Sequence, residues 1–456
     1  MINDLSNKFA DFILDVEYED LSDTVVEAAK KYILDYFISS MAGYKINSNF
    51  NISLIDTINE IDEKSQSNVL FNEKKVSSVN AAFLNASFGH GADIDDGHRT
   101  AQGHPGVVVI PSVLALAEAY NISNKDIITA IVVGYEFFIR FGESMNPSHV
   151  KKGFHTTGTV GAIASGAASA KVLNLNKEQI VSTLGFSAMQ AAGLLQVVES
   201  NQMAKVINPG KAASNGVFAA LLAKRNVLTP NYIFEGKKGF FNAFSDDIKE
   251  ENLEEMFSKD FKINTTYIKL YPSCRHAHGS IDAAILLKDK IRNLDDIKKV
   301  NINVYSTAIK ITGNIDIPKN EDEAKFSLKY IFATALKRGN YTLNDLDTNK
   351  GIDDEIINII NKIEIIQDDS LENREKNIRG TSIEVFLNNG TKITEKIDLP
   401  KGDFEVPAIK DDILIKMESC GDNLISKKNQ NKIVKYIDEF EKENNLEKLF
   451  SLLRNL

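Results

Sequence analysis

The stretch that decides the fold runs from Gly158 to Ala170 and reads GTVGAIASGAASA. Nearly all of its side chains are small, and the distance between packed helices depends on the size of the side chains at the contact. We therefore expect a helix that lies inside a bundle, with its neighbours packed close on several sides. Helix packing alone explains most of these glycine and alanine positions.

Helical patterns surround this stretch throughout residues 1–265. Leu21–Tyr44 places its apolar side chains three or four positions apart, which is the period of an amphipathic helix. Ser123–Asp126 has the form of a capping box, and Asn176–Gln179 has the same form. The uncharged run Ile180–Val198 follows the second box, and its Ser, Thr and Gln side chains predict a buried helix rather than a membrane span.

The sequence pattern changes after about residue 265 and becomes a mixture of strands and helices. Alternating or β-branched runs predict strands, and Asn388-Asn389-Gly390 between two of them predicts a hairpin turn. The predicted strands lie within Lys299–Lys310, Asn358–Ile366, Thr381–Leu387 and Lys392–Ile397, and the predicted helices are Ala283–Lys290 and Ser327–Lys337. Helical periodicity returns in the tail, Asp411–Leu456.

These patterns predict a mainly α protein with two domains. The first is all-helical and is formed by both chain ends, residues 1–265 and 400–456. The second is a smaller α+β domain, residues 266–399. A chain of 456 residues is long for one domain and suits two.

Composition narrows the class of protein further. The formal net charge is −10 and no basic block occurs, which argues against a general nucleic-acid binder. Two cysteines, Cys274 and Cys420, cannot build a disulfide framework and favour a reducing compartment. The N-terminus lacks the pattern of a signal peptide, so we expect a cytoplasmic protein.

The histidines gather in a few polar loops, and the first loop is the richest. It reads GHGADIDDGHR from Gly89 to Arg99 and continues with Gly103-His104-Pro105-Gly106. Three interpretations are open: a polar turn with incidental histidines, a divalent metal site, or a histidine tuned for acid–base work by a neighbouring carboxylate. No helical His-x-x-x-His pair supports the metal.

Three more clusters follow, each in a loop that leads into a helix. Phe154-His-Thr-Thr-Gly158 puts a histidine at a predicted helix N-terminus, a position suited to anions. Lys205 and Lys211 flank an Asn-Pro-Gly turn, and Lys269–Gly279 combines Lys, Arg and two His. Capping and solvated turns are the simpler interpretations of each segment taken alone. Taken together, the clusters predict a pocket for a polycarboxylate.

In their order and spacing, these motifs resemble the MmgE/PrpD family over nearly the whole chain. The matching segments are His90–Asp96, Gly103–Gly106, Phe154–Gly158, Lys205–Ala213, and Tyr271–Gly279. The family includes 2-methylcitrate dehydratase, cis-aconitate decarboxylase and iminodisuccinate epimerase. The resemblance implies a large helical domain, a smaller α+β lid domain, a homodimer, and an active site that needs no cofactor or metal.

The resemblance also implies site residues. Its motifs carry catalytic roles to Asp93, His104, His155, Lys205, His278 and Tyr330. The expected substrate-binding residues are Thr156, Lys211, Lys269, Arg275 and His276. We expect His104 and His155 to be the general acid and base, with Asp93 orienting one of them, and cations to bind the carboxylates of the substrate.

The resemblance leaves the reaction open. The leading expectation is a dehydratase of the 2-methylcitrate type that acts on a di- or tricarboxylate through a carbanion. The alternatives are an itaconate-forming cis-aconitate decarboxylase, an epimerase or isomerase of a small dicarboxylate such as iminodisuccinate, and a catalytically silent binding dimer. Dehydratase members typically have an Asp-Trp-Asn-Asp loop, whereas this chain has Asp93-Ile-Asp-Asp96 and no tryptophan.

Overall fold

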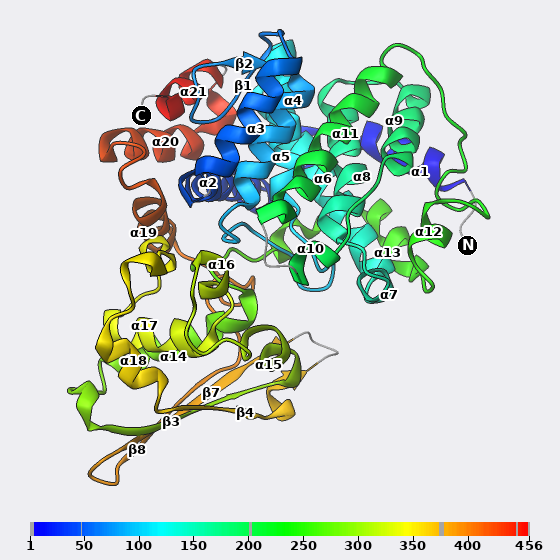
Figure 1. Cartoon of the computed structure of the whole chain (residues 1–456). Helices are drawn as coiled ribbons and strands as arrows, with labels where there is room; N and C mark the ends of the chain where they lie inside the picture. The colour runs from blue at the N-terminus through cyan, green and yellow to red at the C-terminus, as the bar shows by residue number, and fades with distance from the viewer. Residues whose placement is uncertain (1–3, 47, 200–202, 374–377, 444–445, 455–456) are drawn as a thin grey trace. The chain divides into compact units, whose positions relative to one another are not determined.

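The computed structural model describes residues 4–46, 48–199, 203–373, 378–443 and 446–454. These residues form two compact units, and each is described by itself. The first unit comprises Met1–Gly91, Asp95–Tyr267 and Cys420–Leu456, and the second comprises Ala92–Ile94 and Ile268–Ser419. Helices dominate the described chain, which confirms the mainly α class (Figure 1).

The first unit is a bundle of helices, with one short two-stranded hairpin, Ser67–Asn68 and Lys75–Val76. Its helices are α1 Leu5–Asp15, α2 Asp23–Ile46, α3 Ser48–Ile61, α4 Ser78–His90, α5 Gly106–Tyr120, α6 Asn124–Met145, α7 Ser148–Lys151, α8 Thr156–Val172, α9 Lys177–Met189, α10 Gln196–Glu199, α11 Ile207–Ala223, α12 Phe240–Phe244, α13 Glu250–Glu254, α20 Lys427–Asp438 and α21 Leu446–Arg454.

The small-residue helix α8 lies at the centre of this bundle. Every residue from Thr156 to Ala170 is buried, and α8 packs against α5, α6, α9 and α11 (Figure 1). The close approach predicted from GTVGAIASGAASA is confirmed, because a Cβ added at Gly216 of α11 would collide with Ser165 Oγ and the Gly166 nitrogen of α8. No larger side chain fits there unless the two helices move apart.

Gly216→Ala should therefore destabilise the protein by about 1–3 kcal/mol, because overpacking outweighs the gain in helix propensity. The measurement is the free energy of unfolding in urea. Gly161→Ala is the matched control in α8, because its added Cβ would lie 3.1 Å from a movable Val108 methyl group. A Gly216→Ala protein as stable as the Gly161→Ala protein would contradict the tight α8–α11 contact.

Both chain ends contribute to the first unit. Near the N-terminus, Phe9 of α1 is fully buried, with its ring centroid 5.4 Å from that of Phe137. Near the C-terminus, the Phe440 carbonyl accepts a hydrogen bond from Asn124 Nδ2 at 2.8 Å, and Lys30 Nζ donates to the Asp438 carbonyl at 2.9 Å. These buried contacts attach the tail to helices α6 and α2 of the N-terminal part.

The second unit is α+β and contains a four-stranded sheet of order β4-β3-β7-β8. Strand β3 is parallel to β4 and antiparallel to β7, and α14 packs against β7 and β8. Its elements are α14 His278–Lys288, β3 Ile297–Val304, α15 Ser306–Thr312, α16 Glu321–Ala324, α17 Leu328–Arg338, α18 Asp354–Ile360, β4 Ile363–Gln367, β5 Glu372–Asn373, β6 Ile378–Arg379, β7 Thr381–Leu387, β8 Lys392–Ile397 and α19 Lys410–Gly421.

The structure agrees with several predicted elements and changes others. Strands β7 and β8 have the predicted bounds, and their turn has Gly390 at a φ of 87°. The predicted strand Asn358–Ile366 is wrong in its first half, because Asp353 caps a helix that runs to Ile360. Lys299–Lys310 likewise ends as a helix, since the Ser306 nitrogen donates to Asp369 Oδ1 at 2.9 Å at the start of α15.

The boundary between the units also differs from the expected one. The expected helical domain resumed at residue 400, whereas the first unit resumes at Cys420. Most of α19 thus belongs to the second unit. Within this unit, Lys416 Nζ of α19 donates to the carbonyl of Ile94, in the short segment Ala92–Ile94, at 2.8 Å.

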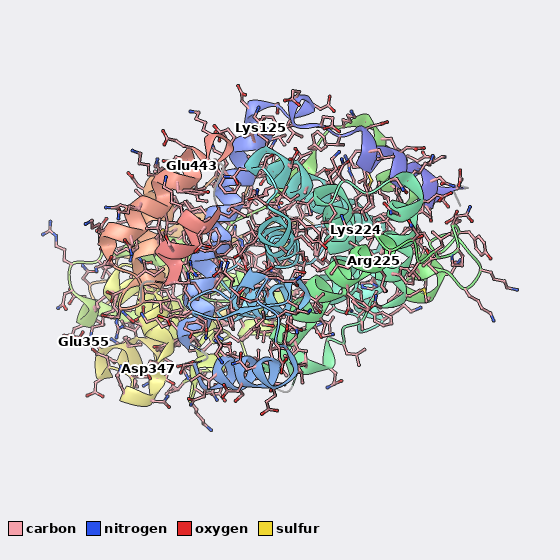
Figure 2. The ribbon with its side chains drawn as sticks, turned by 90° about the horizontal axis from the view of Figure 1, so that it is seen from above. Lys125, Lys224, Arg225, Asp347, Glu355 and Glu443 are labelled. Atoms are coloured by element: carbon pink, nitrogen blue, oxygen red, sulfur yellow. The ribbon has the colours of Figure 1, made fainter. Side chains whose placement is uncertain are left out.

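Charged side chains at several helix ends lie on the surface of the first unit. Figure 2 labels Lys125 at the start of α6, and Lys224 and Arg225 after α11, all of which are exposed. Lys125 Nζ and Lys224 Nζ lie 4.7 and 4.9 Å from the ring centroids of Tyr18 and Tyr120. Among the described residues, no helix combines the length and apolar character needed to cross a membrane.

Candidate active site

Three histidines meet in the first unit at the ends of three helices. His90 is the last residue of α4, His104 precedes α5, and His155 is the N-cap residue of α8. The ring centroid of His90 lies 4.9 Å from that of His104 and 6.0 Å from that of His155. The structure therefore places His90 close to both of the expected catalytic histidines, His104 and His155.

Asp95 is the carboxylate that joins these histidines. Its Oδ2 atom lies 2.8 Å from His90 Nδ1 and 3.1 Å from His104 Nδ1. The side chains of His90 and Asp95 are 0% and 1% exposed, so solvent does not screen this interaction. Asp95 therefore makes the contacts with histidine that we expected of Asp93.

The electrostatic environment favours an ionised Asp95 and neutral histidines. Burial alone would raise the pKa of the Asp95 carboxyl, but His104 and His90 outweigh it and hold this pKa well below its usual range. Burial lowers the pKa of His90 to about 4, despite Asp95. Burial and then the positive charge of Lys205 lower the pKa of His155 well below its usual range. At pH 7 the site therefore holds two neutral imidazoles beside one carboxylate.

The next residue, Asp96, has a different role. Its Oδ2 accepts a hydrogen bond from Tyr135 at 2.7 Å, and its Oδ1 accepts one from the Gly106 nitrogen at 3.0 Å. Burial raises the pKa of Asp96 well above its usual range, although the bond from Tyr135 opposes the shift. Asp96 thus fixes the loop before α5, and its backbone carbonyl accepts from His104 Nδ1 at 2.6 Å.

His155 is held by the segment that was expected to continue helix α9. The sequence predicted a helix over Ile180–Val198, but α9 ends at Met189 and Gly193 adopts a φ of 150°. The carbonyl of Gly193 accepts from the His155 nitrogen at 3.0 Å, and that of Gly153 accepts from the Leu195 nitrogen at 2.8 Å. The uncharged run is therefore a backbone partner of the His155 loop.

Asn208, the second residue of α11, contacts the His155 ring. Its Nδ2 atom lies 3.1 Å from His155 Nδ1. Lys205 lies one turn earlier in a 3₁₀ helix, Met203–Val206, and its charge acts on both His90 and His155. Two of the residues expected to bind the substrate differ in exposure. Thr156 is fully buried, whereas Lys211 is exposed on α11.

The second unit holds the other expected site residues, and four of them lie together. Lys269 Nζ is 3.2 Å from Asp93 Oδ1 and donates to the Asp93 carbonyl at 2.9 Å. Asp93 has a φ of 53°, a left-handed conformation that is uncommon for a non-glycine residue. Burial and then the charges of Arg275 and Lys269 lower the pKa of His278 well below its usual range.

Both ring nitrogens of His278 are already engaged. Arg275 Nη1 donates to Nδ1 at 3.0 Å, and Nε2 lies 3.3 Å from the Ser273 carbonyl. Arg275 also donates to Asp403 Oδ2 at 2.9 Å and to the Pro400 carbonyl at 3.2 Å. In this conformation Arg275 attaches the loop around residue 400 to His278.

Two expected residues make contacts elsewhere in the second unit. Tyr330 is buried, and its hydroxyl donates to the Asp345 carbonyl at 2.6 Å. His276 Nδ1 forms a very short hydrogen bond with the Tyr305 hydroxyl. These contacts fix the start of α17 and the loop before α14.

His90, Asp95 and His104 are also the described residues whose spacing fits a metal ion, with candidate ligand atoms within 4.8 Å of one another. The hydrogen bonds oppose that use of Nδ1. A backbone carbonyl only accepts, so His104 Nδ1 carries a proton where it meets the Asp96 carbonyl, and that proton occupies the lone pair a metal would need. A metal ion at this cluster could therefore use Nε2 of His104 but not Nδ1.

Sequence reasoning missed His90, Asp95 and Asn208 as site residues. All three stand within the motifs that carried the resemblance, His90–Asp96 and Lys205–Ala213. Their residue types gave a partial signal, because a carboxylate near two histidines indicates tuning of one of them. The sequence did not say which of three nearby aspartates would point at the rings.

His149 lies outside the cluster and allows a separate test of buried histidine. Its Nδ1 donates to the Phe244 carbonyl at 3.0 Å, and burial lowers its pKa to about 4, with Lys152 adding to the effect. The unfolded value is about 6.5, so the unfolded chain binds the proton first and stability falls as pH drops from about 6.5 to about 4.

His149→Gln should remove this part of the pH dependence. Between pH 6 and pH 4.5 the free energy of unfolding of the wild type should fall more steeply than that of the variant, by about 1.4 kcal/mol per pH unit. Urea unfolding at several pH values measures both slopes. Equal slopes would show that His149 is not kept neutral in the folded protein.

The helical unit and its cluster define a class of protein: an enzyme-like fold in which buried imidazoles and an ionised carboxylate are placed for proton transfer. Family comparison gives the particular group. The MmgE/PrpD N-terminal domain model matches residues 7–252 and the MmgE/PrpD C-terminal domain model matches residues 271–442. The chain belongs to the MmgE/PrpD family.

Curated relatives are similar over much of the chain at low identity. The cis-aconitate decarboxylase of Aspergillus terreus is 25% identical over 84% of this chain and 82% of its own length. The Homo sapiens cis-aconitate decarboxylase is 24% identical over 100% of this chain and 95% of its own length. The probable 2-methylcitrate dehydratase of Saccharomyces cerevisiae is 25% identical over 59% of this chain and 54% of its own length. The names of these relatives are those of lyases.

Proposed function

We propose that the protein is a lyase that acts on a small di- or tricarboxylate through proton transfer at a carbon next to a carboxylate. The observation that carries this proposal is the cluster of His90, His104 and His155 around the ionised Asp95. A neutral imidazole can accept a proton as a general base and return it as a general acid once protonated, and such proton transfers contribute about 10²–10⁴-fold to rates.

The charge of Lys205 supports the same proposal. A carbanion beside a carboxylate becomes an enediolate, and fixed positive charge stabilises the negative charge that develops on its oxygens. Lys205 acts electrostatically on His90 and His155, so it lies near the groups that would move the proton. We assign it to the substrate carboxylate.

Two reactions fit this site, and proton balance separates them. In dehydration, a base takes the carbon-bound proton, the C–H pair forms the new double bond, the C–O bond breaks, and an acid protonates the departing hydroxyl to give water. In decarboxylation with a shift of the double bond, the C–C bond to one carboxylate breaks, CO₂ leaves, and an acid supplies the proton of the new C–H bond. Dehydration needs both a base and an acid, whereas decarboxylation needs an acid.

The sequence motifs alone favoured dehydration, but the extent of the matches favours decarboxylation as the first activity to test. Relatives named cis-aconitate decarboxylase match over 82% and 95% of their lengths, against 54% for the relative named 2-methylcitrate dehydratase. We therefore infer cis-aconitate as the first candidate substrate and 2-methylcitrate as the second.

The test is incubation of the purified protein with cis-aconitate, 2-methylcitrate, citrate and iminodisuccinate. Release of CO₂ reports decarboxylation, absorbance of the conjugated alkene reports dehydration, and chiral analysis of iminodisuccinate reports epimerisation. Thermal unfolding with each compound reports binding without turnover, since a ligand at 100 times its Kd stabilises by about 2.7 kcal/mol. A catalytically silent binding dimer would be stabilised against thermal unfolding by a compound but would not convert it. No turnover and no protection with any of them would overturn the proposal.

The expected absence of a cofactor and the expected homodimer remain predictions with direct measurements. Treatment with a chelator, followed by metal analysis, should leave the activity unchanged and find no stoichiometric metal. Sedimentation equilibrium should give twice the chain mass of 50.6 kDa. Activity that is lost on chelation and restored by one divalent ion would return His90, Asp95 and His104 to the metal interpretation.

A further inference from the structure

The guanidinium of Arg275 is surrounded by acceptors that all belong to the second unit. Its Nη1 atom donates to His278 Nδ1 at 3.0 Å and to the Lys401 carbonyl at 3.2 Å. Its Nη2 atom donates to Asp403 Oδ2 at 2.9 Å and to the Pro400 carbonyl at 3.2 Å. The two terminal nitrogens carry four N–H groups, so each group has an acceptor. A substrate carboxylate could bind this fork only after these hydrogen bonds had broken.

The loop that supplies these acceptors leads from β8 to α19 and is held in place at two points. Gly402 has a φ of 95°, and a Cβ there would lie 2.1 Å from the Ile268 carbonyl oxygen, so this turn requires glycine. The Lys401 nitrogen donates to Asp282 Oδ2 at 2.7 Å, and Asp282 lies on α14, one turn after the first residue of that helix. The loop is therefore a preformed set of acceptors beside the start of α14.

The bond from Arg275 locates the proton of His278. A guanidinium only donates, so Nδ1 of the ring must be the acceptor and carries a lone pair. The other nitrogen, Nε2, lies 3.3 Å from the Ser273 carbonyl oxygen, which only accepts. Burial and then the charges of Arg275 and Lys269 lower the pKa of His278 well below its usual range. All of this agrees with a neutral ring that has its single proton on Nε2.

We propose that Arg275 and Asp403 are positioning residues that fix His278 as a neutral hydrogen-bond donor with its proton on Nε2, and that Arg275 is not a ligand of the substrate. In this state neither ring nitrogen can act as a base, because Nδ1 already accepts from the guanidinium and Nε2 already carries hydrogen. The ring donates a hydrogen bond and keeps its proton, so its charge does not change. The inference rests on the proposed function only for its effect on kcat and KM.

Asp403 is the counter-charge in this arrangement. Its side chain is 2% exposed and that of Arg275 is 11% exposed, so solvent screens neither charge well. Removing one member of a buried ion pair is strongly destabilising, whereas removing both charges together is tolerated much better. The double variant Arg275→Met with Asp403→Asn therefore removes the donor to His278 and leaves no unpaired charge behind.

The first measurement is ¹H–¹⁵N correlation NMR at pH 7 on the full-length protein labelled at histidine nitrogens, with the His278 signals assigned from a His278→Gln protein. The wild type should show a neutral His278 ring with hydrogen on Nε2. In the double variant, the Nδ1 signal should move to the position of a nitrogen that accepts no hydrogen bond. Hydrogen on Nδ1 of the wild type, or an Nδ1 signal that stays unchanged in the double variant, would overturn the inference whatever the activity.

The second measurement separates positioning from substrate binding. If Arg275 positions His278, the double variant should lower kcat by about 10- to 100-fold and change KM by less than about threefold, because the substrate loses no direct partner. A KM that rises by about tenfold or more with kcat nearly unchanged would show that Arg275 binds the substrate, and it would contradict the inference.

The matched control is Lys299→Met with Glu364→Gln, which removes another ion pair of the second unit, on its sheet. It should leave the His278 signals unchanged and keep kcat and KM within about twofold. The expected His278 signals without turnover of any tested carboxylate would support the arrangement and count against the proposed function. Thermal stabilisation by a bound carboxylate, compared between the wild type and the double variant, then replaces KM. The wild-type spectrum alone decides where the proton lies, so a variant that fails to fold does not remove the test.

Discussion

His155→Gln should lower kcat/KM on the established substrate by about 10²–10⁴-fold, the largest effect on activity that we expect from a single substitution. The reason is that both candidate reactions move a proton, and glutamine, unlike imidazole, has no group that can take up a proton and release it again. The glutamine amide still fits a buried polar position, so the loss should appear in kcat more than in KM. Steady-state kinetics on the purified variant measure both constants.

His149→Gln is the matched control for this variant. His149 lies six positions earlier, is also buried, and bonds to Phe244 and Thr159 rather than to the Asp95 cluster. It should keep kcat/KM within about threefold, because it removes no group from the site. Equal losses in the two variants would indicate general damage, and a His155→Gln enzyme of nearly wild-type rate would show that His155 takes no part in the proton transfer.

Arg140→Met should destabilise the first unit by about 3–5 kcal/mol, because it removes the ion-pair partner of a buried carboxylate, Glu136. Arg140 of α6 is 1% exposed, and its Nε donates to Glu136 Oε1 at 2.6 Å, one helical turn earlier. Burial raises the pKa of Glu136 despite Arg140, so without the arginine the carboxyl would be strongly driven to its neutral form. The free energy of unfolding in urea measures the loss.

Two controls make this prediction specific. The double variant Arg140→Met with Glu136→Gln removes the unpaired charge and should recover part of the stability. Lys299→Met breaks an exposed pair with Glu364 on the sheet of the second unit, 46% and 59% exposed, and should cost at most about 1 kcal/mol. A loss below about 1 kcal/mol for Arg140→Met would show that the pair does not stabilise the bundle.

Much of the fold could be predicted because its signals are local. The small residues of Gly158–Ala170 predicted a buried helix, and α8 is buried along that stretch. Asn176 caps α9 through Gln179, and the β7–β8 hairpin has the predicted bounds. Capping, turn formation and side-chain size act over a few neighbouring residues, so one stretch of sequence is enough to show them.

The errors in the predicted fold come from contacts between residues that are distant in sequence. The run Ile180–Val198 carries no charged residue and was predicted to form one helix. The helix ends at Met189 instead, and the backbone of residues 193–195 forms hydrogen bonds with residues 153–155. The first unit was expected to resume at residue 400 but resumes at Cys420, and Lys416 of the intervening segment bonds to the Ile94 carbonyl, more than three hundred positions away. Such contacts override local propensity, because buried backbone groups must find partners wherever the fold brings them.

The sequence by itself determined the family, the helical bundle and the loops that carry the chemistry. His90, His104, His155, Lys205 and Asn208 all stand in segments whose motifs are recognisable in the amino-acid sequence. Only the tertiary structure decided that Asp95, rather than Asp93, meets the histidines, and that Asn208 contacts His155. The physical reason is that a proton on a ring nitrogen is placed by a partner within about 3 Å. In this chain the partners of His104 and His155 come from different loops and helices.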